Sequence, residues 1–217
     1  MRPLHPIEPV HPIEPVHPIE TESYRILAGR IDLSGWPEGP RAVVARVIHA
    51  TADVDFATSL VVDEAAVAAG VAALRAGAVV VADVEMTRAA VSGLAAACYL
   101  KEVPGLPLED GLLTRTAAAM RLAAARHPQG AVFAIGCAPT ALFELVRLAE
   151  AGEVAPALVV GLPVGFVGAA EAKEALRRSG LPAVSNAGEK GGSAAAGAAV
   201  NALVRLAADP DAGGFPH

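Results

Sequence analysis

Ala131–Ala151 reads AVFAIGCAPTALFELVRLAEA, and this stretch carries the clearest signal of the fold. Its first five residues are continuously apolar, which predicts a buried strand over 131–135. A turn of small residues follows, and Pro139 stands where a helix over 139–151 would begin. A buried strand that leads directly into a helix is typical of a parallel sheet covered by helices on both faces.

The same alternation continues on both sides of this stretch. In the segment 63–75, Val67, Val71 and Leu74 form one apolar stripe of helical period, with Asp63 as the predicted N-cap. The sequence therefore predicts a three-layer α/β fold with a parallel sheet. The other predicted strands are 78–82, 157–160, 183–185 and a weaker one at 96–100; the other predicted helices are 40–49, 85–93, 108–126, 169–179 and 192–207.

The N-terminal segment has a different pattern. HPIEPV occurs at residues 5–10 and again at 11–16, and HPIE follows at 17–20. Proline at every third position favours polyproline II and argues against a helix. We predict an extended arm over residues 1–22, one α/β domain over 23–208, and a flexible tail over 209–217.

The histidines of the repeat suggest a metal site at first sight. His5, His11 and His17 share one face of a polyproline II helix, but neighbouring imidazoles lie roughly 19 Å apart along it. One metal ion needs donors about 2 Å away. A solvated spacer or a duplicated segment is therefore favoured over chelation, which would require the arm to fold back or to pair with another chain.

Composition excludes several classes of protein. The net charge of −6 comes with no basic patch, and aromatic residues make up only 4%, so we expect no nucleic-acid partner. No apolar run approaches the ~20 residues of a membrane helix, and no signal peptide is visible. Cys98 and Cys137 form no CxxC pair and are interpreted as reduced thiols. These features predict a cytoplasmic protein.

Ligands of parallel α/β folds bind beyond the carboxyl ends of the strands, so candidate site residues are expected in the segments that follow the predicted strands. Asp83 follows a strand, and its carboxylate is predicted either to face the crevice or to cap the next helix. His49 ends a predicted helix. It is either suited to proton transfer or completes the helix end, and the residues alone favour neither reading.

Three further segments are candidates for binding. Arg115 could pair with a ligand carboxylate, although a surface arginine is the default. The turn 136–138 is built of small residues and leads into a helix start with unpaired N–H groups, where Cys137 is more consistent with a buried thiol than with a nucleophile. The segment 189–193, EKGGS, forms either an anion site at a helix start or a plain cap.

The segment 160–168, VGLPVGFVG, has three glycines around an apolar centre and matches no nucleotide fingerprint. It could form a backbone wall for a flat apolar ligand, or only a tight connection. Taken together, these segments suit a large, flat, apolar ligand with carboxylates around its rim.

Several of these motifs resemble the precorrin-8X methylmutase family, also called cobalt-precorrin-8 methylmutase. The matching stretches are PIE…ESYRI, RVIHAT, DVEM, GLLTRTAAAM, AIGCAPTALF, VGLPVGFVGAAEAKEAL and GGS with VNAL, in that order. The resemblance implies a flavodoxin-like fold, a homodimer, and no metal or organic cofactor. It also implies an isomerase that moves a methyl group to a neighbouring ring carbon of precorrin-8X or its cobalt form, giving hydrogenobyrinate or cobyrinate.

The resemblance assigns roles to individual residues. His49 corresponds to the proton donor or acceptor, and Ser23 and Arg115 to substrate contacts. Cys137 replaces the asparagine that the family usually has, and the turn before Gly191 retains one cation. The expected substrate-binding residues are Ser23, Thr51, Asp83, Met86, Arg115, Ala138, Thr140, Gly165, Lys190, Gly191, Gly192 and Ser193.

Two other functions compete with this one. A non-catalytic corrinoid-binding protein that sequesters the product would share the crevice, but the presence of His49 favours the enzyme. A Rossmann-type nucleotide enzyme lacks support because the glycine fingerprint is missing. The expected partners are the tetrapyrrole, a second copy of the chain, and neighbouring corrin-pathway enzymes that hand over the substrate.

Overall fold

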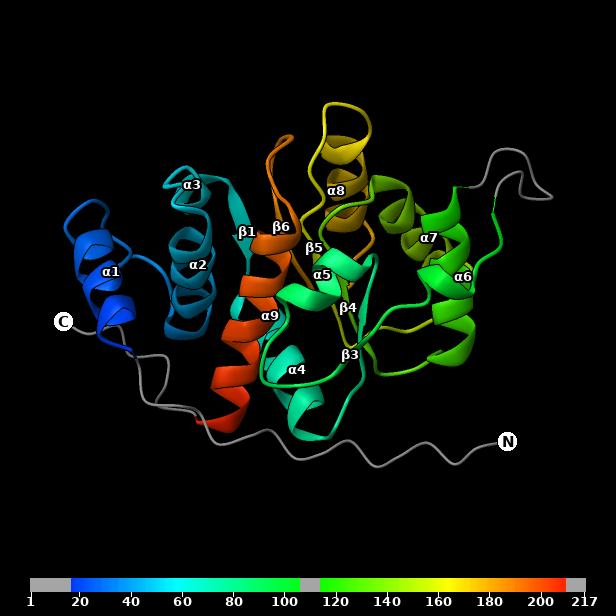
Figure 1. Ribbon diagram of the computed structural model, residues 1–217, viewed down its shortest axis with the longest axis horizontal. Helices are drawn as coiled ribbons and strands as arrows, with labels where there is room; N and C mark the ends of the chain where they lie inside the picture. Colours follow the sequence, from blue (N-terminus) through cyan, green and yellow to red (C-terminus); the bar gives the residue numbers. More distant parts are fainter. Residues whose placement is uncertain (1–16, 106–113, 210–217) are drawn as a thin grey trace.

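The computed structural model describes residues 17–105 and 114–209, and a six-stranded sheet lies at its centre (Figure 1). The strand order is β1-β6-β5-β4-β2-β3. The strands are β1 Leu60–Val62, β2 Val80–Ala82, β3 Ala96–Ala97, β4 Val132–Ile135, β5 Leu158–Gly161 and β6 Ala183–Asn186. The five strands from β2 onward overlap the segments that the apolar runs predict, and β5 and β6 each extend one residue further.

Apart from the helices at 18–28 and 56–59 and a 3₁₀ turn at 100–102, the described helices correspond to predicted ones, with shifted ends. Asp63 is confirmed as an N-cap, since its carboxylate accepts a hydrogen bond from the N–H of Ala66 at 2.7 Å. None of the described helices is long and apolar enough to cross a membrane. The helices are α1 Pro18–Ala28, α2 Glu38–Thr51, α3 Phe56–Ser59, α4 Glu64–Arg75, α5 Glu85–Ala90, the 3₁₀ turn η1 Leu100–Glu102, α6 Arg115–Arg126, α7 Pro139–Glu150, α8 Ala169–Arg178 and α9 Ser193–Ala208.

The predicted helix 108–126 is shorter in the structure. Helix α6 begins at Arg115, and the hydroxyl of Thr114 caps it by accepting from the N–H of Ala117 at 3.2 Å. Residues 108–113 of the prediction lie outside the described residues, which stop at 105 and resume at 114.

The sheet is mixed, so the prediction of a purely parallel sheet is wrong. Strands β2 to β6 pair in parallel, whereas β1 runs antiparallel to β6, with Leu60 opposite Asn186 and Val62 opposite Val184. The edge strand β1 has three residues and follows the single-turn helix α3. A segment this short has no measurable hydrophobic period, and its pairing with β6 is fixed by tertiary packing.

Two apolar cores lie on opposite faces of the sheet. Along β4, Val132 and Ala134 belong to a cluster with α2, α4 and α9, whereas Phe133 and Ile135 belong to a cluster with α6, α7 and α8. Successive strand residues point to opposite faces, so helices cover both sides of the sheet. The connections that follow β5 and β6 lie at the upper edge of the sheet in Figure 1, at the same edge as α3.

The expectation of an extended chain over residues 1–22 is wrong for residues 18–22, which belong to α1. Pro18 is the first helical residue, a position whose N–H needs no intrahelical partner. His17 is the N-cap, and its Nδ1 accepts from the N–H of Ile19 at 3.2 Å. Residues 1–16 of the predicted arm and residues 210–217 of the predicted tail lie outside the described residues.

Candidate functional site

His49 lies near the C-terminal end of α2 and contacts two residues of α1. Its Nδ1 is 2.8 Å from the Oγ of Ser23, and its ring stacks on Tyr24 with 4.9 Å between the ring centroids and 25° between the planes. The structure thus brings Ser23 and His49, two residues singled out in the sequence, into direct contact. With Nδ1 held by a hydroxyl, the ring has a fixed orientation and presents Nε2 on its other side.

The surroundings of His49 favour the neutral imidazole. Burial is the main cause that lowers its pKa below 6.5, and the neighbouring Arg46 and Arg205 add to this, while Glu20 acts in the opposite direction. A half-buried neutral imidazole can accept a proton as a general base or, once protonated, donate it as a general acid.

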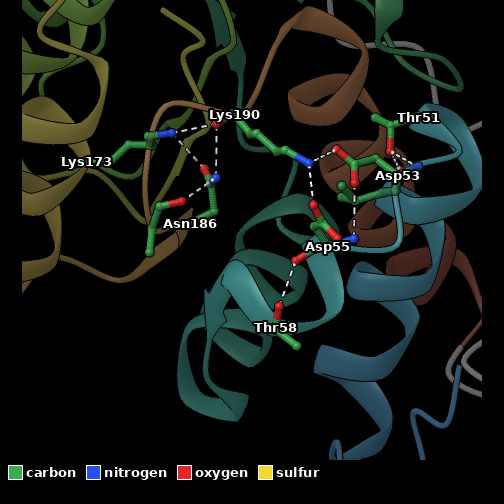
Figure 2. Close-up of polar contacts among 9 residues, drawn as sticks. Thr51, Asp53, Asp55, Thr58, Lys173, Asn186 and Lys190 are labelled. Carbon is green, nitrogen blue, oxygen red and sulfur yellow. Dashed lines mark hydrogen bonds and ion pairs between the residues drawn. The ribbon is translucent and has the colours of Figure 1, made fainter. Parts of the chain in front are cut away.

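Lys190 joins the turn between β6 and α9 to the connection between α2 and α3 (Figure 2). Its ammonium donates to Asp53 Oδ2 and to Asp55 Oδ2, each at 2.7 Å. Hydrogen bonding to these two carboxylates raises the pKa of Lys190. The cation predicted for a ligand carboxylate is therefore already paired within the protein, and a ligand must compete with two aspartates for it.

The backbone of the same turn is held from the other side by α8. The buried ammonium of Lys173 donates to Lys190 O at 2.6 Å and to Asn186 Oδ1 at 3.0 Å (Figure 2). Burial, followed by the charge of Arg177, lowers the pKa of Lys173 to about 8. Gly191 lies so close to β5 that a Cβ there would be 2.2 Å from Leu162 O. The turn is therefore fixed against the sheet before any ligand binds.

The predicted anion site at the start of α9 is largely used by internal contacts. Ser193 is buried and its Oγ shares a hydrogen bond with Thr87 Oγ1 at 2.8 Å, while the N–H of Gly192 donates to Leu162 O at 2.8 Å. Thr51 is also bound locally, since its hydroxyl donates to Val47 O at 2.8 Å. The hydroxyls of Ser193 and Thr51 are therefore both bonded to groups of the protein itself.

Asp83 is buried and binds backbone. One oxygen accepts from the N–H groups of Val84 at 3.0 Å and Gly136 at 3.3 Å, and the other from Cys137 and Ala138, both at 2.8 Å. The N–H groups of the turn 136–138, where a ligand was expected to approach the backbone, are thus satisfied by the protein's own carboxylate. Asp83 fixes the start of α7, a role that neither sequence interpretation included.

Thr140 belongs to a group of three hydroxyls on neighbouring helices. Its Oγ1 lies 2.7 Å from that of Thr114 and 3.1 Å from that of Thr116. Arg115 lies between these threonines in the sequence and donates to Leu100 O at 3.2 Å, which ties α6 to η1. Thr114, Arg115 and Thr140 are exposed, so this group can reach a ligand.

Apolar side chains are exposed on α5, which follows β2, and on the connection that follows β5. Phe166 and Val167 are 91% and 89% exposed, and Met86 is 65% exposed. The N–H of Gly165 donates to Glu189 O at 3.1 Å, which joins the Phe166 loop to the turn of Lys190. These exposed apolar side chains are accessible to a ligand and suit the flat apolar ligand expected from the sequence.

Neither a thiol nucleophile nor a metal centre emerges from the geometry. Burial raises the pKa of the Cys137 thiol, and the charge of Asp83 raises it further, which favours the unreactive protonated form. Within residues 17–105 and 114–209, no three His, Cys, Asp or Glu side chains are grouped so that they could hold a metal ion.

Sequence reasoning missed several residues around His49 and Lys190. Glu20 and Tyr24 are four residues apart, a helical spacing that could have indicated a common face had the segment not been interpreted as extended. The other missed residues, Arg46, Lys173, Asn186 and Arg205, carry no local signal because their partners are distant in sequence.

Comparison with known proteins points to one family. Residues 18–206 match the family model described as Precorrin-8X methylmutase. The precorrin-8X methylmutase of Pseudomonas aeruginosa is 45% identical over 192 residues, which cover 84% of this chain and 91% of that protein. The cobalt-precorrin-8 methylmutase of Priestia megaterium is 38% identical over 195 residues, 87% of each chain. A crystal structure of precorrin-8x methyl mutase from Thermus thermophilus superimposes with a TM-score of 0.80 at 37% identity, covering 88% of this chain and 96% of that one.

Proposed function

This chain belongs to the precorrin-8X methylmutase family and is an isomerase of cobalamin biosynthesis, and we propose here how its residues carry out the reaction. The substrate is precorrin-8X or cobalt-precorrin-8, and a methyl group migrates to a neighbouring ring carbon. The observation that carries the residue assignment is the contact of His49 with Ser23 and Tyr24, which lies inside the matched region.

In the proposed mechanism His49 gives a proton or hydrogen bond to the macrocycle near the migrating methyl. This redistributes π density and lowers the barrier to the shift. A positioned acid is typically worth about 10²- to 10⁴-fold in rate. Ser23 contributes by holding Nδ1, which fixes the direction of Nε2. Fixed orientation of the reacting groups lowers the barrier further.

The remaining contacts divide between the face and the rim of the macrocycle. Met86, Phe166 and Val167 are exposed and would cover the apolar face. The hydroxyls of Thr114 and Thr140 and the guanidinium of Arg115 would bind rim carboxylates, since all three residues are exposed. Lys190 would bind a carboxylate only in exchange for Asp53 and Asp55.

Some properties implied by the family resemblance form part of the same proposal. They are the flavodoxin-like classification, assembly as a homodimer, a cytoplasmic location, and hand-over of substrate by neighbouring corrin-pathway enzymes. The other expected substrate contacts, at Thr51, Asp83, Ala138 and residues 191–193, would act through backbone shape, because their side chains are absent, small or internally bonded.

The function is tested by mixing purified protein with precorrin-8X, and in parallel with its cobalt form, and recording absorption spectra over time. The conjugated system changes as the methyl moves. We expect many equivalents of one form to be converted per protein chain. A spectral shift that stops at one equivalent, without turnover, would instead identify a non-catalytic corrinoid-binding protein.

A further inference from the structure

We propose that Glu20 is a positioning residue that locks α1 onto α2 and α9, so that Ser23 and Tyr24 hold His49 in one orientation. The inference rests on the proposed function only for the role of His49 in turnover. The lock itself follows from contacts among three helices.

One carboxylate joins these three helices. Glu20 lies on α1, and its Oε1 accepts from Arg46 of α2 and, at 2.7 Å, from Nη1 of Arg205 of α9, while its Oε2 accepts from Nη2 of Arg205 at 3.2 Å. The side chain of Glu20 is only 15% exposed. Charged hydrogen bonds with this bidentate geometry and low exposure orient their partners more strictly than ordinary surface pairs do.

The Glu20 contacts and the His49 contacts lie on the same faces of the two helices. Glu20 and Tyr24 are four residues apart on α1, and Arg46 and His49 are three residues apart on α2, so each pair occupies one helix face. Arg46 also donates to the Tyr24 hydroxyl at 3.3 Å. Releasing Glu20 therefore loosens the helix face that carries Tyr24 and the neighbouring Ser23.

Few side chains of α1 pack into the apolar core. Leu27 is the only buried residue of α1 and Tyr24 is partly buried against the same core, whereas Ile19 and Ile26 are 74% and 42% exposed. Leu27 lies four residues beyond Ser23, toward the C-terminal end of the helix. The polar contacts of Glu20 therefore determine how the first turns of α1 lie over His49.

The experiment compares Glu20→Gln with Glu22→Gln in the full-length chain. Glu22 is a matched control because it lies on the same helix and also pairs with an arginine, Arg25, at 2.6 Å, but both side chains are exposed. We expect Glu20→Gln to lower kcat on the order of 10- to 100-fold through misplacement of the reacting groups, and Glu22→Gln to leave it unchanged.

Proton NMR of the His49 ring provides a readout that loss of stability does not move. Stacking on Tyr24 shifts the His49 ring protons, which are assigned by their absence in His49→Asn. Below the unfolding temperature, we expect Glu20→Gln to move these resonances toward their positions in Tyr24→Leu, and Glu22→Gln to leave them in place. Should Glu20→Gln not fold, Arg205→Gln removes the α9 partner alone and is expected to move them in the same direction.

The outcomes separate this inference from the proposed function. Resonances and kcat of Glu20→Gln that equal those of the wild type overturn the lock. A lower kcat with unmoved resonances overturns it as well, because Glu20 would then act by another route. If the wild type converts neither substrate form, the proposed function fails, yet the NMR comparison still decides whether Glu20 positions α1.

Discussion

Replacement of His49 by alanine is expected to lower kcat by about 10²- to 10⁴-fold, the usual contribution of a positioned acid or base. Binding of the tetrapyrrole should change little, because the exposed apolar residues and the threonine hydroxyls remain. Single-turnover absorption spectra measure the chemical step, and a titration of the corrin absorption band measures Kd. The expected pattern is a lower kcat at nearly constant Kd, which marks an interaction made in the transition state.

His127→Ala provides the matched control for this variant. His127 is also partly buried, and burial lowers its pKa as it does for His49. It lies at the C-terminal end of α6, where it bonds Tyr99, far along the chain from the residues around His49. His127→Ala should retain wild-type turnover. Wild-type turnover in His49→Ala would remove His49 from the mechanism.

The pH dependence of kcat reports which form of His49 is active. Burial and Arg46 lower its pKa below 6.5, so the protonated form is present below that pKa and is lost as the pH rises through it. If the proton is transferred in the rate-limiting step, we expect kcat to fall as the pH rises through that lowered pKa, on the acid side of 6.5. If kcat instead falls as the pH is lowered, the active form is the neutral imidazole, acting as a hydrogen-bond donor.

Asp83→Asn is expected to lower the free energy of unfolding by about 3–4 kcal/mol. The Asp83 carboxylate is 1% exposed and accepts four backbone N–H groups. An asparagine NH₂ is a donor, so it would face N–H donors and leave buried groups unsatisfied. Urea denaturation followed by circular dichroism measures this loss.

Asp63→Asn is the control for the loss of a carboxylate. Asp63 is exposed and accepts one N–H at the start of α4, and asparagine caps helices as well as aspartate does. Asp63→Asn should lower the free energy of unfolding by less than about 1 kcal/mol. If Asp83→Asn lost affinity for the tetrapyrrole without losing stability, Asp83 would be a ligand, as the sequence suggested, and not the anchor of the turn 136–138.

Much of the fold was predictable because it is encoded locally. Strands β4 and β5 are apolar runs followed by small residues, and α4 has both an apolar stripe and a capping aspartate. The two errors have different causes. Strand β1 is too short to show a period, and α1 was obscured by a proline repeat that runs directly into it, although Pro18 suits a helix start.

The sequence by itself determined the strand–helix alternation and the family resemblance, and through that resemblance it marked His49 and Ser23 as candidate site residues. It did not determine what those residues contact. Only the tertiary structure places Ser23 against His49 across 26 residues and Glu20 against Arg205 across 185. It also pairs Lys190 with two aspartates and places the Asp83 carboxylate against the N–H group of Ala138, at the start of α7. Propensity and periodicity act over a few residues, whereas the pairing of buried polar groups depends on which helices and strands meet in space.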